Sequence, residues 1–320
     1  MRLDWRINRI LLAAVLLLLG SAGARAEVLK PFILGDTPPG ILNEVVEHVT
    51  SALKAQGFQI VGTYTPYPRA TVICVTNAEL KAAAANAKNG GFGVAQRVAV
   101  TVAKGKIQVA YVNPAYLGTA YGLGKLEGVS ATLKAALGAV QDFGAATGIE
   151  EANLKPGVWR YAMFMPYFPD VDVLNEFKDY KTAVETVEKN LAAREAGTVK
   201  VYRIDLPGKE VSIFGVGLVE GAIDGPDKGD KDTDAEIMGV VDWQELRHTA
   251  FLPYELMVVG NKAVALRGRY RIALHFPDTK MAGAHGFTKI MSAPWSIQIA
   301  LERVAGFKRE LPASPIPLSQ

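Results

Sequence analysis

Histidine and methionine side chains in the second half of the chain could bind a metal ion. His248, His275 and His285 all lie there, and Met281 and Met291 flank the last of them. Imidazole together with thioether groups would suit copper. The spacing matches no recognised set of ligands, however, and methionines beside a helix are more often core residues. We therefore keep these residues as metal candidates and predict no cofactor.

An acidic stretch offers a second metal alternative. Asp230-Lys-Asp232-Thr-Asp234 supplies carboxylates at alternating positions, as a calcium loop does. Such a loop needs a glycine at its sixth position, where Ala235 stands, and an acidic residue at its twelfth, where Val241 stands. We expect a solvated acidic loop inside an insertion that covers residues 220–236.

Cys74 is the only cysteine among the 320 residues, so no intramolecular disulfide can form. It lies in Thr71-Val-Ile-Cys-Val75, and such a β-branched run is typical of a buried strand. A lone thiol could act as a nucleophile or bind a metal, but a free cysteine on an apolar strand is usually a small core residue.

Aromatic, cationic and amide side chains near the ends of expected strands could line a ligand site. A groove between helices and a curved sheet is usually apolar with a few polar anchors. Residues 267–275, taken as a strand, would place Arg267, Arg269 and Arg271 on one face, which is either an exposed edge or an anion-binding surface. The candidate ligand-binding residues are Tyr64, Tyr67, Arg69, Arg97, Tyr111, Asn113, Arg269 and His275.

Glycine-rich stretches come close to nucleotide-binding motifs without matching them. Gly122-Leu-Gly-Lys-Leu-Glu-Gly128 and Gly215-Val-Gly-Leu-Val-Glu-Gly221 place the third glycine one residue late for a dinucleotide fingerprint. Residues 118–125 are too long a loop for a phosphate-binding motif. The chain also lacks the G-x-S-x-G, H-E-x-x-H and C-x-x-C patterns. No motif therefore indicates a particular reaction.

The elements that must position these side chains follow one order in both halves of the chain. Apolar residues with helical spacing predict a helix that ends at Gly57, and a second that ends at Gly197. Two strands and a hairpin follow each helix, then a proline and a closing helix. The strands are expected at 59–64, 71–75, 97–102 and 107–111 in the first half, and at 199–204, 211–216, 254–259 and from 263 in the second. The prolines are Pro114 and Pro277, and the closing helices span 129–137 and 295–304, with Ser292 as the cap of the latter.

This order predicts an α+β fold with two related domains, each an antiparallel sheet with helices packed on one face. We expect the first domain at 27–142, a linker region at 143–178, and the second domain at 179–307 with the insertion 220–236. The Pro-rich tail 308–320 is expected to be mobile.

The N-terminus has the features of a secretory signal peptide. Arg2, Arg6 and Arg9 precede an apolar run at 10–19, and Ala24-Arg25-Ala26 follows it. The alternative is a retained anchor, but the run is shorter than the roughly 20 residues that cross a bilayer. We expect cleavage after Ala26, a periplasmic or secreted product, and no stable membrane insertion after cleavage.

The charge balance changes when this segment is set aside. The whole chain carries 35 Lys+Arg and 32 Asp+Glu, but residues 1–26 hold four arginines and one aspartate. The remaining chain has 31 basic and 31 acidic residues, so it gives no reason to expect nucleic acid as a partner.

The order of elements resembles a known bacterial family. Gly57-Phe58 and the hairpin from Arg97-Val-Ala-Val-Thr-Val102 to Asn113-Pro114 resemble the domain of unknown function 302 family. The second half resembles a diverged member through Leu256-Met-Val-Val259 and His275-Phe-Pro-Asp278. The resemblance implies a TATA-binding-protein-like fold and no established activity. Many members place a Pro-Cys pair where this chain has Ala95-Gln96, so thiol chemistry there would be absent.

Together these observations favour an exported, soluble, non-enzymatic ligand-binding or accessory protein with a small amphipathic or anionic ligand. The alternative is a periplasmic metal-binding, redox or hydrolytic enzyme that uses the second-half histidines or Cys74. A third hypothesis is a structural role, in which an exposed strand edge recruits a protein partner.

Overall fold

The computed structural model describes residues 27–221 and 232–308. The expected signal peptide, most of the expected acidic insertion and nearly all of the Pro-rich tail lie outside the described residues. Within the described part, no helix is long and apolar enough to cross a membrane.

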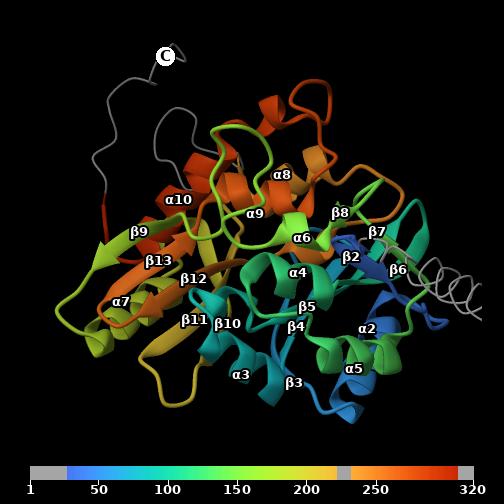
Figure 1. The fold of residues 1–320 in the computed structure, drawn as a ribbon, viewed down its shortest axis with the longest axis horizontal. Helices are drawn as coiled ribbons and strands as arrows, with labels where there is room; N and C mark the ends of the chain where they lie inside the picture. Colours follow the sequence, from blue (N-terminus) through green and yellow to red (C-terminus); the bar gives the residue numbers. More distant parts are fainter. Residues whose placement is uncertain (1–26, 222–231, 309–320) are drawn as a thin grey trace, which may run out of the picture.

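The described chain is an α+β structure built on two antiparallel sheets of six and five strands, so the expected fold class is confirmed (Figure 1). The first sheet has the order β3-β4-β5-β6-β2-β7, with strands β2 (Phe32–Leu34), β3 (Gln59–Tyr64), β4 (Ala70–Thr76), β5 (Gln96–Ala103), β6 (Lys106–Val112) and β7 (Gln141–Phe143). The second has the order β10-β11-β12-β13-β9, with strands β9 (Val171–Glu176), β10 (Thr198–Asp205), β11 (Val211–Leu218), β12 (Tyr254–Val259) and β13 (Lys262–Leu266). A further short pair joins β1 (Val28–Leu29) to β8 (Ile149–Glu150).

Amphipathic helices cover one face of the first sheet. Val45, Val49 and Leu53 form a buried stripe along α2 (Leu42–Ala55), and α5 (Glu127–Leu137) buries a similar stripe beside it. Each such side chain contributes about 1.5–3 kcal/mol when fully buried. Helices α7 (Tyr180–Ala192) and α10 (Ala293–Val304) pack on the second sheet in the same way. The first helix stops where expected, because Gly57 adopts a φ of 83°.

The order of elements around the second sheet matches that around the first. In the first half, α3 (Ala78–Asn86) and the 3-10 turn η1 (Gly90–Gly93) precede the hairpin, and α4 (Pro114–Tyr121) follows it. In the second half, α8 (Asp234–Val241), η3 (Thr249–Phe251) and α9 (Gly268–His275) take the same places. The connections also hold α6 (Glu151–Leu154), η2 (Glu195–Gly197) and η4 (Phe287–Ile290). Both first strands carry a β-bulge, β3 at its third residue, between Ile60 and Gly62, and β10 at its fourth, between Lys200 and Tyr202.

The two halves exchange contacts reciprocally and share buried apolar side chains. Turn η1 packs on β11 and β12 of the second sheet, whereas η3 packs on β5 and β6 of the first. Tyr116 on α4 donates to the carbonyl of Leu274 at 2.7 Å, and Tyr270 on α9 contacts the carbonyl of Ala120 at 3.5 Å. One cluster of buried residues accordingly contains side chains from both halves.

The second half differs from the expected boundaries at several points. Residues 268–275 form α9 and not a strand, because β13 ends at Leu266. Pro114 is the first residue of the helix that follows the first hairpin. The equivalent residue in the second half is Gly268, so the predicted match between Pro114 and Pro277 is wrong. Helix α7 stops at Ala192, well before Gly197. Strand β9 also falls inside the expected linker region.

Candidate functional site

A cluster of buried charges lies between the two sheets. The guanidinium of Arg97 on β5 donates to Glu255 Oε1 at 2.6 Å, and that of Arg271 on α9 donates to Glu255 Oε2 at 2.7 Å. All three residues are at most 3% exposed. One carboxylate thus joins arginines from both halves, and each of its oxygens accepts a charged hydrogen bond.

Two of the candidate histidines adjoin this cluster. Nδ1 of His275 lies 2.9 Å from the carbonyl of Arg271, so it carries the proton, and Nε2 accepts from Arg97 at 3.2 Å. Burial and the neighbouring guanidiniums hold the pKa of His275 well below its usual range. His248 donates from Nδ1 to the carbonyl of His275 at 3.0 Å, and burial lowers the pKa of His248 to about 4. Both rings are therefore neutral at pH 7.

The third candidate histidine lies elsewhere. His285 is exposed and stacks on Trp243 with ring centroids 4.7 Å apart. The expectation that the second-half histidines form one metal site is wrong, because His248 and His275 are buried in hydrogen bonds away from it. No group of three or more His, Cys, Asp or Glu side chains within residues 27–221 and 232–308 could hold a metal ion.

Cys74 is a core residue on β4, paired across the strands with Arg97. Burial raises the pKa of its thiol to about 12. The thiol therefore stays protonated at neutral pH, whereas the nucleophilic form of cysteine is the thiolate.

Two predicted ligand-binding tyrosines instead join the first half to the second. Tyr64 donates to Asp234 Oδ2 at 2.6 Å, and the hydroxyl of Tyr67 lies 2.6 Å from Thr249 Oγ1. Tyr64 is buried and Tyr67 is half-buried, so neither ring lines an open groove. The hydroxyl of Tyr111 donates to the carbonyl of Gly138 from within the core under α2 and α5.

The other predicted binding residues do not converge either. Asn113 caps α4 by accepting from the amide of Ala115 at 3.1 Å. Arg69 is exposed in a turn, and Arg269 is exposed on α9. The expected anion-binding face is wrong, because in a helix Arg269 points away from Arg271 while Arg271 is buried against Glu255.

The acidic stretch is not solvated where the structure describes it. Asp232 accepts hydrogen bonds from Ser292 at 2.9 Å and from Ser296 at 2.6 Å, and it is 6% exposed. Asp234 is fully buried and accepts from the amide of Leu218 at 2.9 Å. Asp230 lies outside the described residues. The sequence predicted that the side chain of Ser292 caps α10. This prediction is wrong, because the side chain makes no capping hydrogen bond and binds Asp232 instead.

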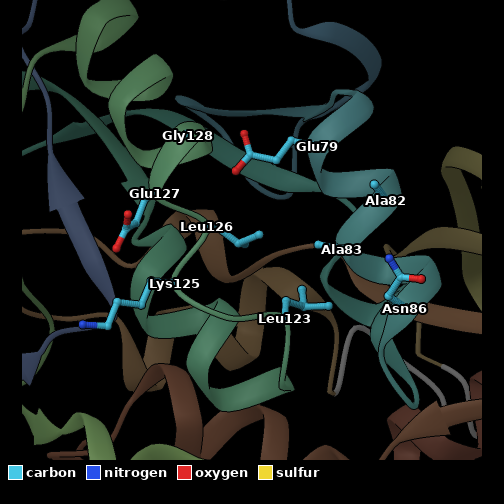
Figure 2. A pocket seen from close by; sticks show the side chains of 9 residues that line it. All are labelled: Glu79, Ala82, Ala83, Asn86, Leu123, Lys125, Leu126, Glu127 and Gly128. Carbon is cyan, nitrogen blue, oxygen red and sulfur yellow. The ribbon is translucent and has the colours of Figure 1, made fainter.

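One concave site with room for a small ligand is a groove between α3 and the start of α5, with a volume of about 500 Å³ (Figure 2). Small and aliphatic side chains form its apolar part, and carboxylates and an amide stand at its margins. The lining residues are Glu79, Ala82, Ala83, Asn86, Leu123, Lys125, Leu126, Glu127 and Gly128.

Local chain geometry produces this groove. Asn77 caps α3 by accepting from the amide of Leu80 at 2.8 Å, and alanines on α3 leave space beside it. On the other side, Gly122, Gly124 and Leu126 all have positive φ, which folds the chain tightly between α4 and α5. The near-miss motif at 122–128 is therefore a groove wall and not a nucleotide-binding loop. None of the lining residues is among the ligand-binding residues predicted from the sequence, and the glycine spacing at 122–128 is the local signal that could have located the groove.

The groove carries unneutralised negative charge. Lys125 extends away from its centre and pairs with Glu27 at 2.6 Å and with Glu151 at 3.1 Å (Figure 2). Glu79 and Glu127 have no ion-pair partner within the described part of the chain. The carboxylate of Glu79 lies against Gly128, where a Cβ would overlap it.

In the second half, the matching elements are bridged. Ser292, the residue before α10, and Ser296 on α10 both donate to Asp232, which lies two residues before α8, and these hydrogen bonds tie the two helices together. No such bond spans α3 and α5 among the described residues. No family model matches the chain, and neither a curated protein nor a solved structure matches it.

Proposed function

We propose that the protein is an exported, non-enzymatic binding protein whose site is the groove between α3 and α5, and that its ligand is a small amphipathic molecule with a positive charge. The observation that carries the proposal is an open groove of ligand size, lined by both aliphatic and polar side chains, whose two marginal carboxylates, Glu79 and Glu127, have no ion-pair partner among residues 27–221 and 232–308. Its volume of about 500 Å³ falls within the usual range for small-molecule sites.

The apolar surface and the carboxylates have separate tasks in this proposal. Burial of an alkyl chain against Ala82, Ala83 and Leu123 supplies most of the affinity, because exposed ion pairs are worth only about 0.2–1 kcal/mol each. Glu79 and Glu127 select the sign of the ligand's charge. An anionic ligand, the other class expected from the sequence, is disfavoured here by repulsion.

A binding role agrees with the placement of the reactive side chains. Cys74, His248 and His275 are buried on the far side of the first sheet from α2 and α5, and none lines the groove. Duplication of one ancestral unit followed by bridging of α8 to α10 would leave a single open copy of the groove. This history is part of the proposal and rests on the matching order of elements in the two halves.

The proposal is tested by calorimetric titration of the purified protein with octylammonium and with octanoate. Octylammonium should bind and octanoate should bind at least about fivefold more weakly, which corresponds to about 1 kcal/mol. Ala83→Trp should block binding of both. The double variant Glu79→Gln/Glu127→Gln should lose the preference for the cation, whereas Glu47→Gln, an exposed carboxylate change on α2, should keep it. Equal binding of both probes to the unaltered protein, or binding that survives Ala83→Trp, would overturn the proposal.

A further inference from the structure

An apolar turn protrudes from the loop that connects α6 to β9. Met165 donates its amide to the carbonyl of Ala162 at 3.1 Å, so Met163 and Phe164 are the two central residues of a β-turn. Phe164 is 91% exposed and Met163 is 71% exposed, the two highest values among the large apolar side chains of residues 27–221 and 232–308. Because both residues stand at the tip of the same turn, they form one apolar projection.

The backbone of this turn is strained. Phe164 has a φ of 67°, a left-handed conformation that such a turn normally gives to glycine or asparagine. A bulky residue seldom adopts it, and strain of this kind is typical of functional sites. Since the ring is almost fully exposed, packing within the protein does not account for a phenylalanine at this position.

Aromatic residues on both sides of the turn hold it in place. The guanidinium of Arg160 lies over the ring of Tyr167, 5.0 Å from its centroid, and closes the neck of the loop. Tyr161 donates to the carbonyl of Thr279 at 2.6 Å and packs edge-on against Phe287, with ring centroids 5.1 Å apart. The tip is therefore presented on a fixed base, which lowers the entropic cost of docking.

The two loops that Tyr161 joins carry an excess of positive charge. Residues 155–170 and 277–291 lie side by side near α9, in the upper part of the view in Figure 1. Other apolar side chains in these loops are also more than half exposed, namely Val158, Met281 and Met291. The chain after residue 26 has no net charge, whereas the charged residues of the two loops are Lys155, Arg160, Lys280 and Lys289 against Asp170 and Asp278.

We propose that this end of the molecule docks reversibly on an anionic lipid bilayer, with Met163 and Phe164 inserted among the lipids. Arg160 precedes Met163 by three residues, a distance of at most about 11 Å along the chain. The headgroup layer is about 5–8 Å thick on each side of a bilayer, so a tip that reaches the acyl chains leaves the guanidinium beside the lipid phosphates. Tyr161 and Tyr167 at the neck match the tyrosines that are enriched at membrane interfaces.

A bilayer suits this surface better than a protein partner. A stable protein interface buries about 800 Å² on each partner and needs a matching pocket, whereas an aromatic side chain at a tip buries about 150–250 Å². A fluid bilayer accepts a convex tip without a matching shape. Because even a myristoyl chain gives only marginal membrane binding, two side chains should bind weakly and need anionic headgroups as a second signal. The proposal is independent of the groove between α3 and α5.

The test is co-sedimentation of the purified protein with vesicles of phosphatidylcholine alone and of phosphatidylcholine mixed with phosphatidylglycerol. The unaltered protein should bind the mixed vesicles more tightly. Met163→Ser/Phe164→Asn removes the apolar tip and keeps the turn, because asparagine accepts the left-handed conformation. This variant should bind the mixed vesicles at least about tenfold more weakly. Ile41→Asn, the same kind of change at a residue that is 66% exposed before α2, should bind like the unaltered protein.

A second pair of variants tests the charges. Lys280→Gln/Lys289→Gln should weaken binding to the mixed vesicles at least about fivefold and leave binding to phosphatidylcholine unchanged. Lys54→Gln/Lys134→Gln changes exposed lysines on α2 and α5 and should have no effect. All variants should keep the melting temperature, since the changed side chains are exposed. They also share the N-terminal segment of the unaltered protein, so differences between them report on the loops alone.

A fluorescent label locates the tip directly. Cys74 is buried, so a polarity-sensitive dye that reacts with thiols attaches to the cysteine that Phe164→Cys introduces. Its emission should shift to the blue with mixed vesicles and be quenched by lipids with brominated acyl chains, whereas a dye attached through Ile41→Cys should show neither change. Equal vesicle binding by the tip variant and the unaltered protein, or an unshifted emission at position 164, would overturn the proposal. A dimer that forms without vesicles and is lost in the tip variant would also overturn it, because the surface would then bind a second copy of the chain.

Discussion

Arg97 and Glu255 occupy the second positions of two matching strands, β5 and β12, and their charged groups meet 2.6 Å apart in the buried core. Arg97 pairs in register with Cys74 on β4, and Glu255 pairs with Gly215 on β11. The two halves therefore carry opposite charges at equivalent places. Two copies of the first half, joined in the same way, would bring arginine against arginine, so this pair favours association of unlike halves.

Removal of the carboxylate should destabilise the protein strongly. Glu255→Gln leaves Arg97 and Arg271 buried without a counter-charge, and loss of one partner from a buried ion pair costs about 3–5 kcal/mol. The free energy of unfolding from urea titration measures this loss. Glu185→Gln is the matched control, because it breaks the exposed pair with Lys181 and should change stability by less than about 0.5 kcal/mol. Equal effects of both changes would show that the buried cluster does not hold the halves together.

The ring of Tyr111 should behave as a core residue. It is 1% exposed beneath α2 and α5, so Tyr111→Ala should lower the free energy of unfolding by about 3–5 kcal/mol. Tyr111→Phe keeps the ring and removes only the hydrogen bond to Gly138, which should cost about 1 kcal/mol. Chemical denaturation of both variants measures the two losses in the free energy of unfolding. A small loss for Tyr111→Ala would mean that the ring lines open space.

Cys74 should resist modification in the folded protein. Burial raises the pKa of its thiol to about 12, so almost no thiolate exists at pH 8. We expect iodoacetamide to label Cys74 only after denaturant is added, as measured by mass spectrometry of the intact protein. Rapid labelling without denaturant would revive the hypothesis of a cysteine-based enzyme.

The sequence predicts the long elements well and the contacts between halves poorly. Strands β3 and β12 have the expected ends because alternating β-branched residues and glycine turns are local signals. Helix α9 was misread as a strand, since the pairing that ends β13 at Leu266 involves β9 and lies far away in sequence. Taken alone, the charge pattern of Arg267–Arg271 fits both the helical period of about 3.6 residues and the strand period of two residues.

The candidate sites show the same limit. Arg97 and His275 were both candidates, but their meeting depends on packing between halves that no local pattern encodes. The groove depends on what alanines on α3 leave unfilled and on the positive φ of Leu126, a residue type that seldom takes it. The three second-half histidines look like one group in the sequence, but packing separates them, because His248 and His275 are buried whereas His285 is exposed.

Protonation of Asp234 should make stability depend on pH. Burial raises the pKa of this carboxyl from 3.8 to about 7. Between these values the folded state binds a proton that the unfolded state has lost, so the contribution of Asp234 to stability decreases as pH rises from about 4 to 7. His248 acts oppositely, because burial lowers its pKa from 6.5 to about 4. We expect the stability of the unaltered protein relative to Asp234→Asn to fall steadily between pH 4 and 7 in urea titrations and to level off above pH 7. The same comparison with Glu47→Gln, an exposed carboxylate, should give a constant difference. A difference for Asp234→Asn that stays constant or grows with pH would show that Asp234 is ionised throughout.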